Sequence, residues 1–157
     1  MFKTSSIIIK GALNFNLKTV ANAFYNNNLK GKKFAVWGLA FKPDTDDIRE
    51  APSLYNIQEL IAGGAEIIAY DPEAMENVKV ILGDAISYAE TAYDALENAD
   101  ALLVFTEWQI FRNPDFDRIS SLLKEKVIFD GRNLYDLKSM NNKGFIYKSI
   151  GREDVLK

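Results

Sequence analysis

The sequence predicts an α/β fold with a doubly wound, mostly parallel sheet and helices on both faces. Two observations carry this prediction. From residue 32 onward, short apolar segments alternate with segments whose apolar residues recur at helical spacing. The apolar segments are also largely continuous, as strands are when helices cover both faces of a sheet. Such alternation is typical of Rossmann-like folds, and one further helix is expected ahead of the first strand.

Seven segments are predicted as strands, of which the third and fourth are the weaker candidates. They cover residues 34–37, 66–70, 78–82, 86–88, 101–105, 127–129 and 145–150. Pro52 is a favourable first helical residue and Gly63-Gly64 a favourable helix end, so a helix is expected between them. Further helices are expected over residues 91–99, 113–123 and 136–142, with a short helix or turn at 73–77.

Residues 1–30 are predicted to form a separate N-terminal segment, and residues 31–157 the sheet domain. Apolar residues at helical spacing indicate a helix in the first segment, with Asn14 or Asn16 as its N-cap and an Asn run at 26–28 as its end. The apolar positions are Leu13, Leu17, Val20, Ala21 and Phe24. This stripe needs a partner, in the core or at an interface. Left uncovered, it predicts self-association.

The composition excludes several classes of function. A net charge of −3 and a pI near 5.1 give no electrostatic surface for nucleic acid or for an anionic membrane. The sequence contains no cysteine and no histidine, which excludes disulfides, thiolate or imidazole metal sites, and catalysis by either side chain. No apolar run approaches the roughly 18 residues of a membrane span, so the cytoplasm is the expected compartment.

The most informative stretch runs from Gly38 to Ser53, GLAFKPDTDDIREAPS. It separates an expected strand from an expected helix, a connection that usually takes about 2–6 residues in α/β units. A long polar loop costs chain entropy without adding core, which indicates a functional role. Because ligands of open parallel sheets bind outside the carboxyl ends of the strands, the loop lies where a ligand is expected.

Two cations follow expected strand ends at that edge, Lys42 after the first strand and Arg132 after the strand at 127–129. Together with free backbone amides at Gly131 and the next helix start, they suit a diphosphate. Phe41 adds a flat apolar surface of the kind that a base or ribose needs. Singly, each has a plainer explanation, since Lys42 can be merely solvated and Arg132 can pair with Asp130.

The acidic residues of the loop also have a plain explanation. Asp44, Asp46 and Asp47 lack the glycine and the distal glutamate of a calcium loop. Capping of the next helix and pairing with Arg49 or Lys42 explain them better, and no metal site is expected. Alternatively, Arg49 points away from the sheet, toward a partner domain or a ligand.

The glycine fingerprint of dinucleotide-binding folds, G-x-G-x-x-G, is absent. Asp71, at the end of the second expected strand, is therefore predicted to form a turn with Pro72 rather than to bind a ribose. The domain is not expected to bind NAD in the standard way by itself.

These motifs together resemble a known family. The stretch from Gly38 to Ser53 resembles the signature that opens the C-terminal, UDP-binding domain of the nucleotide-sugar 6-dehydrogenases, the UDP-glucose/GDP-mannose dehydrogenase family. The run from Phe129 to Asn133, FDGRN, resembles the second signature of that domain. Asp71-Pro72 and residues 105–108, FTEW, lie where the family has similar residues. The resemblance covers about residues 30–152, and residues 12–30 resemble the end of the family's central helix.

The resemblance implies a parent enzyme that oxidises the sugar C6 alcohol to a carboxylate with two NAD, through covalent intermediates on a cysteine. It implies that Phe41, Lys42 and Arg132 bind the UDP-sugar. Arg49 would reach the NAD, which an N-terminal domain mainly holds. That domain and the catalytic cysteine are absent from this sequence, so no catalytic residue and no turnover are expected in this chain alone. The implied partners are the UDP-sugar, the missing domain or subunit, and a second copy in a parent homodimer.

The run Ala51-Pro52-Ser53 is similar to the UDP-glucose branch of the family, which predicts a parent that makes UDP-glucuronate for polysaccharide biosynthesis. The same domain from a UDP-N-acetylmannosamine or GDP-mannose dehydrogenase is an alternative. A stand-alone, non-catalytic nucleotide-binding or assembly module is another. Residues 1–11 do not match the family, which leaves open an expressed piece, a truncated gene product and a split subunit.

Overall fold

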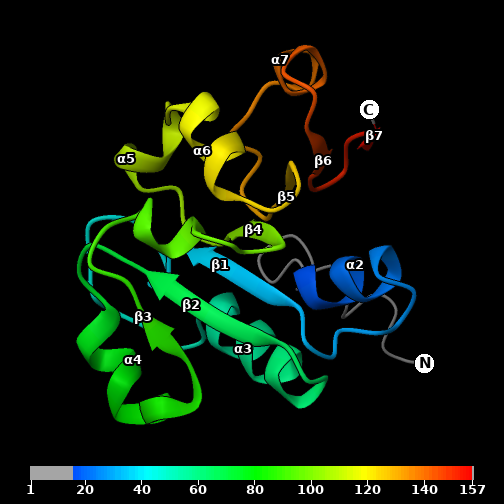
Figure 1. The fold of residues 1–157 in the computed structure, drawn as a ribbon. Coiled ribbons are helices and arrows are strands. Elements are labelled where there is room, and N and C mark those ends of the chain that lie inside the picture. The colour runs from blue at the N-terminus through cyan, green and yellow to red at the C-terminus, as the bar shows by residue number, and fades with distance from the viewer. Residues whose placement is uncertain (1–15, 157) are drawn as a thin grey trace.

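The computed structural model describes residues 16–156 and shows a seven-stranded sheet in the order β3-β2-β1-β4-β5-β6-β7 (Figure 1). Neighbouring strands are parallel except β6 and β7. The predicted doubly wound, mostly parallel α/β sheet is thereby confirmed. The strands are β1 (Lys33–Trp37), β2 (Glu66–Tyr70), β3 (Ser87–Tyr88), β4 (Ala101–Val104), β5 (Val127–Asp130), β6 (Ile146–Lys148) and β7 (Val155–Leu156).

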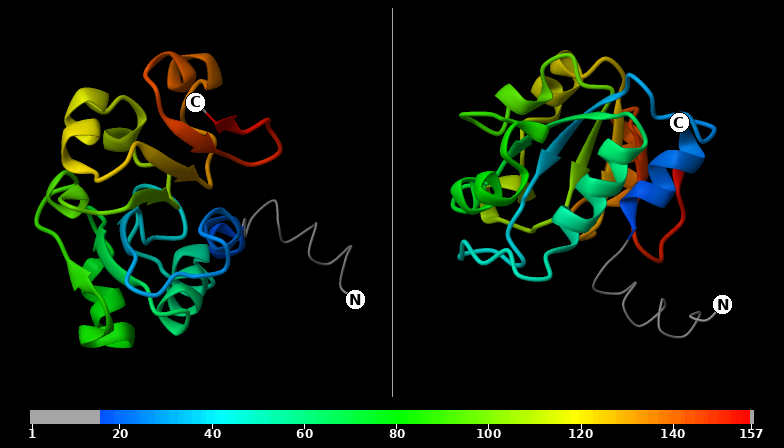
Figure 2. Two further views of the ribbon diagram at one scale, coloured as in Figure 1. Left: turned by 45° about the vertical axis from the view of Figure 1, so that its right-hand side comes forward. Right: turned by 90° about the horizontal axis from the view of Figure 1, so that it is seen from below.

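Helices cover both faces of this sheet. The views in Figures 1 and 2 show α2 and α3 on one face and α5, α6 and α7 on the other. The helices are α2 (Leu17–Phe24), α3 (Pro52–Ala62), α4 (Met75–Leu82), α5 (Gln109–Arg112), α6 (Phe116–Leu122) and α7 (Leu137–Asn142), with 3-10 turns η1 (Gly83–Ala85) and η2 (Asp94–Leu96). None of the helices within residues 16–156 is long and apolar enough to cross a lipid bilayer.

Strand β1 lies in the interior of the sheet, paired with β2 on one side and β4 on the other. Its residues from Phe34 to Trp37 are fully buried, as expected for a strand covered on both faces. Trp37 stacks on Phe111 of α5 with 4.8 Å between ring centroids, and its indole N–H donates to the Ala92 carbonyl at 2.7 Å. This packing fixes the carboxyl end of β1, from which the long loop leaves.

The strongly apolar elements agree with the sequence. The strands predicted at 34–37, 66–70, 101–105 and 127–129 match β1, β2, β4 and β5 to within one residue at each end. Helix α3 begins at Pro52 and is capped by Gly63. The helix predicted at 136–142 is α7, and Asp136 caps it by accepting the Ser139 N–H. Long apolar runs and helix caps are therefore reliable signals in this chain.

The strand predicted at 78–82 is wrong, because these residues lie in α4. The carboxylate of Asp71 accepts the Glu73 and Ala74 N–H groups at 2.8 Å and so organises the first turn ahead of this helix. Val78 is its buried residue, whereas Val80 and Ile81 face solvent. The local turn thus outweighs the strand propensity of the β-branched side chains. The helix predicted at 91–99 is reduced to η2, and α5 and β7 were not predicted.

Helix α2 covers the sheet beside α3. Asn16 is its N-cap and accepts the Thr19 N–H at 3.1 Å, whereas Leu13 and Asn14 lie outside the described residues. Leu17 and Ala21 are fully buried, and the Phe24 ring meets Phe129 of β5 edge to face at 5.6 Å. The described part of the apolar stripe is therefore covered within the chain, so the condition for the predicted self-association is not met there.

Candidate functional site

Two hydrogen bonds order the loop between β1 and α3. The Phe41 N–H donates to the Asp47 carbonyl at 2.8 Å, and the Ser53 hydroxyl donates to the Leu39 carbonyl at 2.7 Å. The loop begins at Gly38, where φ is +96° and an added Cβ would lie 2.6 Å from Thr106 Cβ. Glycine alone permits both this backbone conformation and this approach of the β1 and β4 loops.

Asp71 fixes the start of this loop from the neighbouring strand β2. Its Oδ2 accepts the Leu39 and Ala40 N–H groups at 2.7 and 3.0 Å and the Trp108 indole N–H at 3.1 Å. Its Oδ1 accepts the two N–H groups ahead of α4, and the residue is fully buried. The prediction that Asp71 forms a turn is confirmed. Its carboxylate is directed inward and holds three loops together, which sequence reasoning missed.

Arg132 lies across the carboxyl edge and joins two other loops to its own. Its Nε donates to the Phe105 carbonyl at 3.0 Å and lies 3.2 Å from Oε1 of Glu107, while Nη2 donates to the Phe41 carbonyl at 3.1 Å. The alternative that the side chain pairs with Asp130 is wrong, because only the Arg132 backbone N–H reaches that carboxylate, at 2.7 Å. The side chain retains 20% of its surface exposed.

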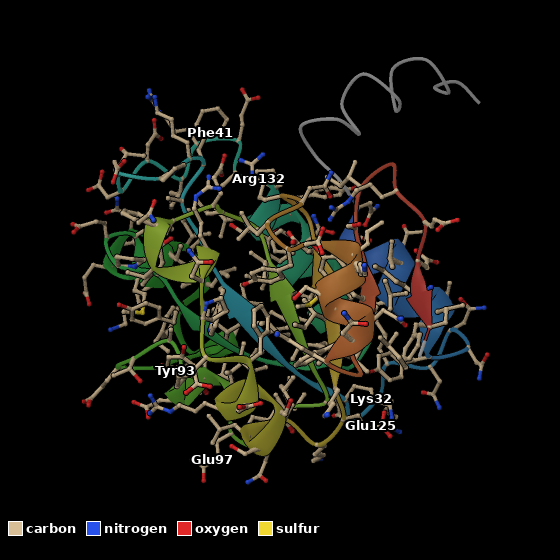
Figure 3. All side chains as sticks on the ribbon, turned by 90° about the horizontal axis from the view of Figure 1, so that it is seen from above. Lys32, Phe41, Tyr93, Glu97, Glu125 and Arg132 are labelled. Carbon is tan, nitrogen blue, oxygen red and sulfur yellow. The ribbon has the colours of Figure 1, made fainter. Side chains whose placement is uncertain are left out.

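Phe41 lies beside Arg132, and Lys42 follows it in the loop between β1 and α3. Figure 3 shows Phe41 and Arg132 together at one end of the molecule, with Lys32 and Glu125 at the opposite end. Phe41 keeps 42% of its surface exposed, although its carbonyl is held by Arg132. Lys42 is exposed, and within residues 16–156 no hydrogen bond or ion pair engages its ammonium group. The structure thus brings Phe41 into contact with Arg132 at the predicted edge, and Lys42 is the next residue of the same loop.

The prediction of a free backbone amide at Gly131 is wrong. The Gly131 N–H donates to the Val104 carbonyl at 2.9 Å, because β5 continues its ladder with β4 for one residue beyond the strand. The next N–H, of Arg132, is taken by Asp130, and Asp136 caps the start of α7. These backbone amides are therefore not available to an anion, which leaves the side chains of Arg132 and Lys42 as the candidate donors.

The acidic residues of the loop behave partly as predicted. Asp47 pairs with Arg49, whose Nε and Nη2 donate at 3.0 and 2.8 Å. This hydrogen bonding holds the pKa of Asp47 at about 2, below its usual 3.8. The prediction that these acids cap α3 is wrong, because the N-cap of this helix is Ala51, which makes no side-chain hydrogen bond. Arg49 is 88% exposed and points out from the loop, and the described residues contain no acidic cluster suited to a metal ion.

The Arg132 loop rests on a buried polar network that sequence reasoning did not find. Asp130 accepts the Arg132 and Leu134 N–H groups, each at 2.7 Å, and the Tyr147 hydroxyl at 2.6 Å. Burial raises the pKa of Asp130, against the lowering effect of these donors. Arg152 donates to the Tyr147 hydroxyl at 2.8 Å. No spacing rule joins these residues, because the pairing of β5 with β6 brings them together.

Asn133 locks the same loop from its other side. Its φ is +56°, a conformation that asparagine adopts more readily than most residues. Its side-chain amide donates to the Ile150 carbonyl at 3.0 Å, and its Oδ1 accepts the Ile150 N–H at 2.8 Å. The backbone from which Arg132 projects is therefore held on both sides, by Asp130 and by Asn133.

The chain was compared with known families and proteins. Residues 35–137 match the profile described as UDP-glucose/GDP-mannose dehydrogenase family, UDP binding domain. A UDP-glucose 6-dehydrogenase of Rhizobium meliloti is 42% identical over 137 residues, which are 87% of this chain and 31% of that protein. UDP-glucose 6-dehydrogenase TuaD of Bacillus subtilis is 44% identical over 82% of this chain and 28% of its own length. The chain thus spans about a third of the curated relatives it matches.

A solved structure gives the same result. A UDP-glucose dehydrogenase from Pyrobaculum islandicum superposes with a TM-score of 0.74 at 27% identity, over 90% of this chain and 30% of that one. The segment that matches the family profile, residues 35–137, contains the β1 loop, Asp71 and the Arg132 loop, from which the candidate site is built. On these grounds the chain belongs to the UDP-glucose/GDP-mannose dehydrogenase family, of which it contains the UDP binding domain.

Proposed function

We propose that Lys42 and Arg132 bind the diphosphate of a UDP-sugar and that Phe41 packs against its flat or apolar part. One observation carries the proposal: Arg132 holds the Phe41 carbonyl at 3.1 Å, so one loop presents the aromatic ring and Lys42 beside a guanidinium. The Arg132 Nη1 group engages no acceptor among the described residues. Arginine offers a bidentate fork and lysine a mobile point charge, a combination suited to two phosphates.

The role of the domain in a complete enzyme is positioning. We propose that residues 31–157 form the UDP-binding domain and that residues 1–30 are an N-terminal segment whose helix corresponds to the end of the family's central helix. The parent enzyme oxidises UDP-glucose to UDP-glucuronate with two NAD, and the dinucleotide is held mainly by a domain outside this sequence. Asp71 supports this division, because the carboxylate that would bind a ribose in a dinucleotide fold is saturated by five N–H donors.

The proposal assigns Arg49 to the cofactor side. Its guanidinium is 88% exposed and held outward by Asp47, so it can reach a ligand bound by another domain. The isolated chain is expected to have no dehydrogenase activity, because its sequence has no cysteine to carry the covalent intermediates. Arg49→Ala should leave UDP affinity unchanged in this chain.

The proposal is tested by calorimetric titration of the 157-residue chain with UDP, UDP-glucose and NAD. We expect binding of UDP and UDP-glucose and none of NAD. Lys42→Ala and Arg132→Ala should each weaken UDP binding by about tenfold or more, the loss expected for a charged hydrogen bond. Lys126→Ala removes the same charge at the amino edge, where Nζ donates to the Lys143 carbonyl, and should bind UDP normally.

Two outcomes would contradict the proposal. Equal UDP affinity in Lys42→Ala, Arg132→Ala and Lys126→Ala would place the nucleotide elsewhere. No binding of UDP at millimolar concentration would favour a non-catalytic assembly module. Titration with UDP-N-acetylmannosamine and GDP-mannose then identifies the sugar, and preference for UDP-glucose is expected from the 42% and 44% identical relatives named above.

A further inference from the structure

A closed ring of contacts surrounds the proposed nucleotide site. It runs from Asp71 to the Leu39 and Ala40 N–H groups, along the backbone to Phe41, and across to Arg132 at 3.1 Å. From the Arg132 Nε it passes to Glu107 at 3.2 Å, along the backbone to Trp108, and back to Asp71 at 3.1 Å. Both halves of the ring thus begin at Oδ2 of Asp71 and meet at the guanidinium of Arg132.

Asp71 cannot take part in ligand binding directly. The residue is fully buried, and its two oxygens accept five N–H donors, three on Oδ2 and two on Oδ1. A carboxylate has about four lone-pair sites, so none is left for a ligand. Any influence on the nucleotide must pass through the loops that it holds.

We propose that Asp71 is a positioning residue for the nucleotide, which sets the place of Phe41 and Lys42 relative to Arg132. The inference rests on the proposed function. The chain length between the fixed Ala40 N–H and Lys42 is two residues, so displacement of the Ala40 amide moves the lysine directly. Through Trp108, the same oxygen also limits how far Glu107, and with it the Arg132 side chain, can move.

Asp71→Asn tests this role with almost no change in volume. The amide has one acceptor oxygen, and its NH2 group must face N–H donors on one side of the residue whichever way it turns. We expect the loop at residues 39–42 or the turn ahead of α4 to be released. Faster amide hydrogen exchange at Leu39, Ala40 and Phe41, measured by NMR, would report the first of these directly.

The matched control is Asp100→Asn at the opposite edge of the sheet. Asp100 precedes β4, and its Oδ2 accepts the Lys33 N–H at 2.8 Å, so the same substitution loosens a comparable backbone anchor. UDP affinity is measured by calorimetry well below the melting temperature of each variant. We expect Asp71→Asn to raise the Kd for UDP about tenfold and Asp100→Asn to leave it unchanged, even if both lower the melting temperature.

A double-mutant cycle separates positioning from general stability. If Asp71 acts by placing Lys42, then Lys42→Ala should cost less UDP affinity in the Asp71→Asn background than in the wild-type chain. An equal cost of Lys42→Ala in both backgrounds would overturn the inference. So would a wild-type Kd in a folded Asp71→Asn variant whose Leu39, Ala40 and Phe41 amides exchange faster than in the wild-type chain. A wild-type chain that binds no UDP would overturn the proposed function itself, a separate result.

If Asp71→Asn does not fold, or releases only the turn ahead of α4, Trp108→Phe is the variant that tests the inference. The phenyl ring retains much of the apolar volume but removes the indole N–H that closes the ring onto Asp71. We expect a smaller rise in the Kd for UDP, about threefold, because Oδ2 keeps its two backbone donors. An unchanged Kd in Trp108→Phe would then overturn the inference.

Discussion

The Tyr147 hydroxyl donates a 2.6 Å hydrogen bond to Oδ2 of Asp130, two residues before Arg132. The hydroxyl also accepts from Arg152 at 2.8 Å. Residues near the C-terminal end of the sheet therefore support the loop that carries Arg132, the residue proposed to bind phosphate. Asp130 and Tyr147 are both buried. A buried carboxylate without its donors is costly, and therefore this pair governs how firmly the Arg132 loop is held.

Tyr147→Phe should lower the free energy of unfolding by about 1–3 kcal/mol, because it leaves the buried Asp130 carboxylate short of one donor. Urea denaturation followed by circular dichroism measures the loss. Tyr55→Phe is the control, since this tyrosine is 57% exposed and the same atom is removed on α3. A loss no larger than that of Tyr55→Phe would contradict the prediction.

The contribution of Asp130 to the free energy of unfolding should fall as the pH rises above 3.8, the ordinary pKa of aspartate. Burial raises the pKa of Asp130 in the folded state, so the folded chain binds a proton more tightly than the unfolded chain. Between the unfolded and folded pKa values, the unfolding free energy therefore declines with pH. An NMR titration of the Asp130 carboxyl carbon should give a midpoint above 3.8. A midpoint below that value would show that the hydrogen bonds outweigh burial.

Asp47 should titrate in the opposite direction. Its pKa of about 2 is caused chiefly by the side-chain hydrogen bond from Arg49. The Asp47–Arg49 interaction is thus complete above pH 3.8 and is lost as the pH falls through about 2. In an NMR titration, Arg49→Ala should bring the Asp47 pKa back toward 3.8. Because Arg49 is 88% exposed, the melting temperature should hardly change.

Gly38→Ala should lower the free energy of unfolding by at least about 2 kcal/mol, since it combines backbone strain with overpacking. Its φ is +96°, and the new Cβ would lie 2.6 Å from Thr106 Cβ and N. Gly31→Ala isolates the first effect, because φ there is +78° but nothing lies within 4 Å of the added carbon. Thermal melts of the two variants should differ clearly. Equal losses would mean that the Thr106 loop yields freely.

The placement of Lys42 and Arg132 at the same edge of the sheet could be predicted from the sequence, because it follows from the topology alone. Each residue follows a strand, and the carboxyl ends of parallel strands meet at one edge of the sheet. The same reasoning failed for the Gly131 amide, which continues the ladder to Val104. Strand ends are uncertain by a residue, and that residue decides whether an N–H is free.

The polar framework beneath the site lay beyond sequence reasoning. Asp71 could be recognised as a turn residue, but its bonds to Leu39 and Trp108 span 32 and 37 positions and depend on the final packing. The Tyr147 hydroxyl reaches Asp130 only because β6 lies next to β5. In the segment that forms α4, the amphipathic pattern is weak and the β-branched residues favour a strand. The turn organised by Asp71 instead starts a helix there.

The packing of α2 on the sheet determines how long a piece of chain is needed for a complete folded domain. The family profile begins at residue 35 and ends at residue 137. Yet Leu17 and Ala21 of α2 complete the core on one side, and Tyr147 of β6 completes it on the other. A piece cut at the profile boundaries would lose both and expose Phe129 and Asp130. The segment that folds as a complete domain is therefore longer, at both ends, than the segment that matches the family profile.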